Sequence, residues 1–66
     1  MTTRETLEKI SPEIRSDIEE FRNDYKNPVA NKSLVRARLS GYTKALRSAG
    51  LITEQERRIL FVYGTV

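Results

Sequence analysis

The chain contains no cysteine and no histidine among its 66 residues. Without cysteine it can form neither a disulfide framework nor a thiolate metal site. Without histidine it lacks the commonest metal ligand and the commonest general base. The sequence also has no glycine-rich phosphate loop and no spacing typical of metal ligands. We therefore expect a protein that is not an enzyme and that holds neither a metal nor a cofactor.

Long apolar runs are missing as well. The longest uninterrupted run, Ile59 to Tyr63, has five residues, whereas a helix that spans a bilayer needs about 20. The start of the chain, Met1 to Glu5, is polar and leads into no apolar segment, so it does not have the pattern of a signal peptide. We expect a cytoplasmic protein without membrane contact, in which residues 1–66 form a single helical domain.

The few prolines and glycines divide the chain into helical segments. Thr2 with Glu5 and Thr53 with Glu56 have the spacing of capping boxes, and Ser11-Pro12 is a typical helix start. Asn27-Pro28 and Gly50 are typical helix ends. We expect an all-α, compact bundle of three or four short helices. Residues 3–26 form either two helices or one kinked helix, and later helices cover about 33–49, capped by Asn31 or Ser33, and 54–63.

Two of these segments carry apolar residues at helical spacing. The steps of three and four place each set on one stripe of its helix. The first stripe is Ile14, Ile18, Phe21 and Tyr25, and the second is Val35, Leu39, Tyr42, Leu46 and Ala49. Gly41 lies at the edge of the second stripe, where we expect it to allow two helices to cross closely.

Charge is distributed unevenly along the chain. Residues 1–30 carry five basic and seven acidic groups, whereas residues 31–66 carry seven basic and two acidic groups. No acidic residue occurs between positions 27 and 53. The expected third helix places a row of cations and hydroxyls opposite its apolar stripe, and such a row can follow a sugar-phosphate backbone. Its members are Lys32, Arg36, Ser40, Thr43, Lys44 and Arg47.

This basic face supports a small non-enzymatic protein that binds nucleic acid or has a regulatory role. The residues expected to contact phosphate are Lys32, Arg36, Arg38, Lys44 and Arg47. A simpler interpretation is a solvated face whose cations meet the acidic row Asp17, Glu20 and Asp24 of the preceding helix. Arg38 lies closer to the apolar side, where it would cover core residues or pair with a carboxylate. A helix-turn-helix is disfavoured, because Glu54 and Glu56 would open the recognition helix and repel phosphate.

The apolar run near the C-terminus supports an alternative function. The residues of a possible oligomer interface there are Ile59, Phe61, Val62 and Tyr63. A short helix that is apolar on all sides lies either in the centre of a bundle or against a partner. In the second case the chain forms a homodimer, or is a protein-interaction module that binds and modulates a larger partner through segment 59–63 or the basic face.

Overall fold

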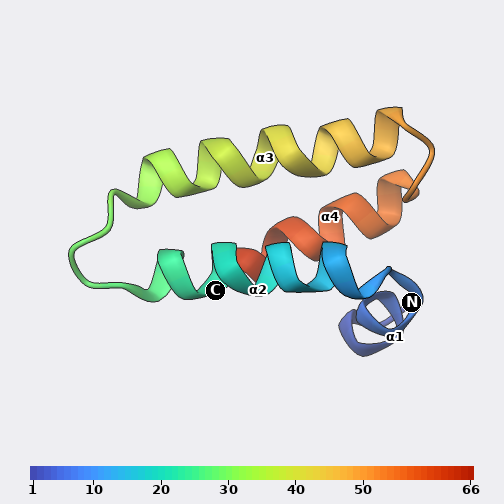
Figure 1. Cartoon of the computed structure of the whole chain (residues 1–66), viewed down its shortest axis with the longest axis horizontal. Coiled ribbons are helices and arrows are strands. Elements are labelled where there is room, and N and C mark those ends of the chain that lie inside the picture. The colour runs from blue at the N-terminus through green and yellow to red at the C-terminus, as the bar shows by residue number, and fades with distance from the viewer.

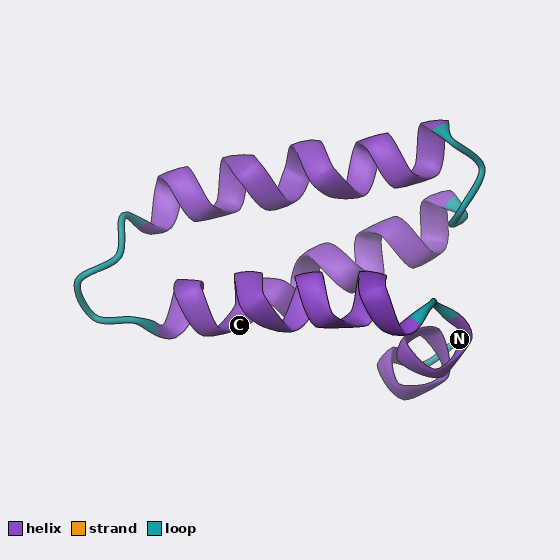
Figure 2. Ribbon diagram, in the orientation of Figure 1, coloured by secondary structure: helices purple, strands orange, loops and turns teal.

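The computed structural model describes all residues 1–66 and contains four α-helices and no strand (Figure 2). The helices are α1 (Thr3–Lys9), α2 (Pro12–Lys26), α3 (Lys32–Ser48) and α4 (Glu54–Gly64). The predicted all-α bundle is confirmed. The alternative of one kinked helix over residues 3–26 is wrong, because Ser11 has extended backbone and caps α2 by accepting a hydrogen bond from the Ile14 amide at 3.3 Å.

Helix α4 is the element that holds the bundle together. Helices α2 and α3 run antiparallel, and α4 packs against both of them, while α1 turns away from the start of α2 (Figure 1). Helix α1 also packs on α4, so α4 has substantial contacts with each of the other three helices. Of the two positions expected for the C-terminal helix, the centre of the bundle is the one that the structure shows, and its residue Leu60 has no exposed surface.

Local capping explains where the helices begin and end. Both predicted capping boxes form, Thr2 with Glu5 and Thr53 with Glu56. Asn31, and not Ser33, caps α3, and Gly50 follows α3 with the positive φ of 76° that favours glycine. The carboxylate of Glu56 also lies 3.2 Å from the Lys9 ammonium, which attaches α1 to the start of α4. The pKa of Glu56 is lowered chiefly by the hydrogen bond that its carboxylate accepts from the Thr53 amide, and further by the contact with Lys9.

The core is small and comes from three of the helices and the turn before α4. Its buried members are Ile18, Leu39, Leu46, Ile52 and Leu60, with Phe21, Tyr42, Phe61 and Tyr63 packed against them. Most of the predicted second stripe lies in or beside this core. Ala49 is an exception: α3 ends at Ser48, so Ala49 belongs to the exposed turn that follows.

The expected role of Gly41 is wrong. A side chain added at Gly41 would meet no atom within 4 Å, because this part of α3 faces away from the other helices. The close approach occurs at Gly64 instead, at the end of α4, where the side chain of Leu39 packs against the glycine backbone. Gly64 is buried, and a Cβ at this position would overlap with one methyl group of Leu39.

Alanine substitutions at these two glycines should have opposite effects on stability. Gly41→Ala should stabilise the protein by up to about 1 kcal/mol, because it replaces a poor helix former at an open position. The midpoint of thermal unfolding, followed by circular dichroism, should then rise by up to about 4–8 °C. Gly64→Ala should lower the midpoint, because Leu39 must move. A lower midpoint for Gly41→Ala would show that this face of α3 is covered in solution.

Candidate nucleic-acid interface

The five cations predicted to contact phosphate have different surroundings along α3. Arg47 reaches toward α4, and Lys44 lies one turn before it on the same side of α3. Arg38 lies on the other side of α3, beside α2. The remaining two, Lys32 and Arg36, contact the end of α2. The structure therefore separates the predicted set into three groups with different surroundings.

Lys32 and Arg36 both contact Tyr25. The Lys32 ammonium donates a hydrogen bond to the main-chain oxygen of Tyr25 and lies 4.7 Å from the centre of its ring. The Arg36 guanidinium donates to the Tyr25 hydroxyl at 2.8 Å. A cation near the last carbonyls of a helix is favoured by the helix dipole. Both contacts join the start of α3 to the end of α2, beside the loop 27–31 that connects the two helices.

Arg38 faces acidic surroundings. It lines an open hollow between α2 and α3 together with Asp17, Glu20, Asp24 and two aromatic residues. No ion pair joins α2 to α3, so the predicted pairing of the basic face with this acidic row does not form. Asp17 instead accepts a hydrogen bond from the Tyr42 hydroxyl at 2.7 Å, and burial together with that bond raises the pKa of Tyr42. Three carboxylates make the α2 side of the molecule unfavourable for phosphate.

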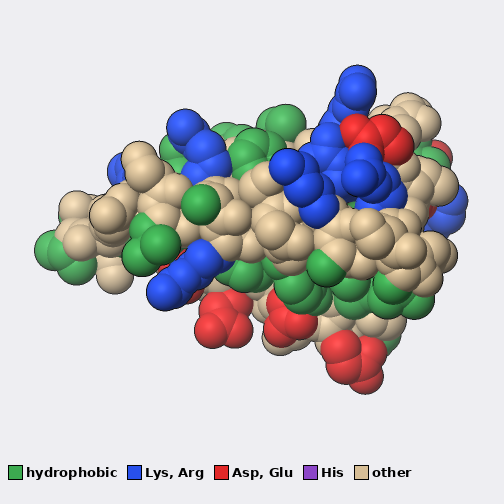
Figure 3. All heavy atoms as spheres, turned by 90° about the horizontal axis from the view of Figure 1, so that it is seen from above, with side chains coloured by type: hydrophobic (Ala, Val, Ile, Leu, Met, Phe, Trp, Pro, Cys, Tyr) green, Lys and Arg blue, Asp and Glu red, His purple; other side chains and the backbone are tan.

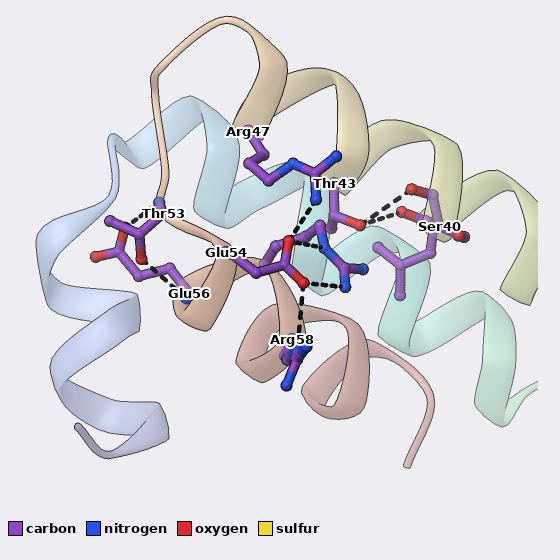
Figure 4. A network of polar contacts seen from close by, with 9 residues as sticks. Ser40, Thr43, Arg47, Thr53, Glu54, Glu56 and Arg58 are labelled. Carbon is purple, nitrogen blue, oxygen red and sulfur yellow. Dashed lines mark hydrogen bonds and ion pairs between the residues drawn. The ribbon is translucent and has the colours of Figure 1, made fainter.

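The placement of Thr43 on the exposed face is wrong. Thr43 is fully buried, and its hydroxyl donates to the main-chain oxygens of Leu39 at 2.9 Å and Ser40 at 3.1 Å (Figure 4). The prediction took the side opposite the apolar stripe as exposed. However, α2 and α4 both pack on α3, so α3 is covered over a wider arc than one stripe, and a side chain on the flank of that stripe is buried as well.

An arginine cluster that the sequence analysis missed lies at the start of α4. The carboxylate of Glu54 accepts hydrogen bonds from three guanidinium groups, as Figure 4 shows for Arg47 and Arg58. Arg57 donates to both carboxylate oxygens, at 2.8 and 2.7 Å. Arg47 donates at 2.5 Å and Arg58 at 3.1 Å. The sequence does contain a signal for this cluster, because arginines that follow a glutamate by three and four residues lie beside it on a helix.

This cluster has an excess of positive charge and of free donors. Three arginines surround one glutamate, which leaves two net positive charges. Each guanidinium has five N–H donors, yet the three together make only four hydrogen bonds to Glu54. The Arg57 side chain is 17% exposed and that of Arg58 is 74% exposed. We call Lys44, Arg47, Arg57 and Arg58 the basic α3–α4 surface.

The charges divide the molecule into two sides. In the view onto α3, basic side chains gather at one end around a small acidic group, while acidic side chains follow the opposite edge (Figure 3). The Arg57 and Arg47 guanidiniums, in that order of effect, hold the pKa of Glu54 far below its usual range. Glu54 therefore stays ionised, and paired with the three arginines, throughout the physiological pH range.

The C-terminal apolar run lies mostly inside the bundle. Phe61 and Tyr63 pack against the core, and Ile59 is half-buried. The Tyr63 hydroxyl donates to Glu19, and the Arg22 guanidinium lies 4.3 Å from the centre of the Tyr63 ring. Val62, at 61% exposed, is the one residue of the four-residue predicted interface that points mainly to solvent.

None of the four helices is long and apolar enough to cross a membrane. Comparison with protein-family models, with characterised proteins and with solved structures finds no match for this chain.

The lowered pKa of Glu54 predicts a pH dependence of stability. A group whose pKa is lower in the folded state stabilises the fold fully above its ordinary pKa of 4.5, and this contribution decreases as the pH falls toward the lowered value. The difference in unfolding free energy between the wild type and Glu54→Gln should thus be largest at pH 6–7 and should shrink below about pH 4.5. Urea unfolding of both proteins at several pH values measures this difference in free energy. A difference that is independent of pH would contradict the ion pairs with Glu54.

Proposed function

We propose that this chain is a small non-enzymatic protein that binds nucleic acid, in a regulatory role, through phosphate contacts of the basic α3–α4 surface. One observation carries the proposal: three guanidiniums from two helices converge on a single carboxylate and keep most of their N–H donors free. Guanidinium groups bind phosphate oxygens with two parallel hydrogen bonds, which gives both affinity and geometry.

The surroundings of this surface support the same proposal. It lies on helices, whose side chains are held more firmly than those of loops. The acidic row Asp17, Glu20 and Asp24 lies on the other side of α3, so a polyanion is attracted to the α4 side and repelled from the α2 side. Phosphate contacts alone carry no sequence information. We therefore expect binding of low sequence specificity, with a Kd of about 10⁻⁴–10⁻⁶ M at physiological salt.

The predicted residues contribute unequally in this proposal. Lys44 and Arg47 belong to the basic α3–α4 surface. Lys32 and Arg36 are exposed but hold Tyr25, so they add long-range attraction at the far end of α3. Arg38 contributes least, because it lines the hollow with the acidic row.

Charge-reversal variants should distinguish binding at this defined surface from a general attraction of nucleic acid by the net charge of the protein. Arg58→Glu should weaken binding to a fluorescein-labelled duplex about tenfold or more at low salt, because a phosphate contact becomes a repulsion. Arg38→Glu and Arg4→Glu change the net charge by the same amount and should each weaken it less than about threefold. Fluorescence anisotropy measures the affinity of each of the three variants for the duplex. Arg4 is a suitable control, because it lies on α1 with its side chain 90% exposed.

The salt dependence of wild-type binding provides a second readout in the same experiment. With two to four phosphate contacts, log K should fall with log[salt] at a slope of about −2 to −4 for duplex DNA. If the wild type does not bind duplex DNA or single-stranded RNA at low salt, the proposal is wrong. Equal losses for the three reversals would show attraction by net charge and no defined surface.

A second candidate function is a protein-interaction module that uses the C-terminal segment 59–63, as a homodimer or with a larger partner. The observation in its favour is the side chain of Val62, which is apolar and 61% exposed. Truncation after Arg58 cannot test it, because the deletion removes buried Leu60 and Gly64 and should unfold the bundle.

A charge placed at Val62 tests this second candidate without touching the core. Val62→Glu should leave the helix content unchanged, because the side chain is exposed. If the segment forms a homodimer, the wild type should sediment as a dimer and Val62→Glu as a monomer in analytical ultracentrifugation. A wild type that is monomeric at all accessible concentrations excludes the homodimer.

A further inference from the structure

The carboxylate of Glu54 lies where an external anion would bind. Each of its oxygens accepts two hydrogen bonds. Oε1 accepts from Arg47 and Arg57, and Oε2 accepts from Arg57 and Arg58. The two parallel bonds from Arg57 have the same fork geometry with which arginine binds a phosphate group. Glu54 is also the first residue of α4, at the helix end where the dipole favours negative charge.

The fold does not need Glu54 to start this helix. The capping box of α4 consists of Thr53 and Glu56, whose side chains satisfy the free amides. Glu54 takes no part in that box, and its side chain is 41% exposed. It can therefore rotate into solvent while the helix start stays capped. Arg57, in contrast, is largely covered and should stay in place.

We propose that Glu54 occupies a phosphate-binding site of its own chain, and that a phosphate group binds to Arg47, Arg57 and Arg58 by displacing the Glu54 carboxylate. The inference rests on the proposed function and adds to it the ligand group and its competitor. Phosphate and carboxylate use the same donors, so the internal carboxylate lowers the affinity for the external anion. The phosphate comes either from within a nucleic-acid strand or from a strand end, which carries more charge as a monoester.

The first test compares two variants that each remove one negative charge from the first turn of a helix. Glu54→Gln should raise the affinity for a single strand of about 12 nucleotides about tenfold, because guanidinium donors become available to phosphate. Glu13→Gln, on α2, is the matched control: Glu13 is exposed and forms no ion pair. It should change the affinity no more than about twofold. The strand is used with a 5′-phosphate and with a 5′-hydroxyl.

Each outcome of this comparison decides the inference. A gain for Glu54→Gln beyond the control with both strands supports it, with phosphates inside the strand as the source. A gain with only the 5′-phosphorylated strand supports it, with the strand end as the source. Affinity equal to that of Glu13→Gln overturns it. Affinity below that of the wild type also overturns it, because Glu54 would then orient the arginines for binding and not compete with the phosphate.

A second measurement needs no variant and separates this inference from the proposed function. In the wild type, titration with inorganic phosphate should shift the NMR signals of the Nε–H groups of Arg47, Arg57 and Arg58, together with the side-chain carboxyl carbon of Glu54. The Nε–H signal of Arg4 should not move with them. If no strand binds but these signals shift, the phosphate site is present and nucleic acid is not its ligand. If the strands bind and the Glu54 signal does not move, the displacement is wrong.

Discussion

The contact between Leu39 of α3 and the backbone of α4 at Gly64 is the constraint on which the rest of the structure depends. Leu39 and Leu60 have no exposed surface, and the glycine allows the Leu39 side chain to lie directly on the end of α4. A thin core can tolerate little loss of packing. The short turn 49–53 places the arginines at the start of α4 next to Arg47, and this contact keeps the rest of α4 beside α3. The basic α3–α4 surface is thus a consequence of the turn and of the core packing together.

Local features of the fold could be predicted from the sequence, because each depends on residues close together in the chain. The two capping boxes, the break at Ser11-Pro12 and the positive φ at Gly50 all follow from local backbone chemistry. The errors at Gly41 and Thr43 have a different cause. They concern which sides of α3 are covered, and that depends on where α2 and α4 pack. A single periodic stripe does not contain this information.

The candidate site shows the same division between local and long-range information. The excess of basic residues in the second half could be read directly from the sequence, but the set of cations available to a ligand could not. Tyr25, seven residues before Lys32 in the chain, engages both Lys32 and Arg36. The acidic row on α2 reduces the value of Arg38. In contrast, the pairing of Glu54 with Arg57 and Arg58 depends only on a spacing of three and four residues within one helix, so it could have been predicted from the sequence.

The position of Glu54 connects the stability of the bundle to its proposed binding. The same carboxylate that joins the end of α3 to the start of α4 also takes up donors that phosphate would use. The three ion pairs of Glu54 lie on a partly exposed surface and contribute only a small, pH-dependent part of the stability. Removal of Glu54 should therefore leave the protein folded, while it changes the local charge from two to three positive charges. Two helices whose mutual orientation comes from apolar packing can hold three guanidiniums together without an anion, and this makes displacement of Glu54 physically feasible. The basic α3–α4 surface is then preorganised by the core, and Glu54 sets how strongly it binds.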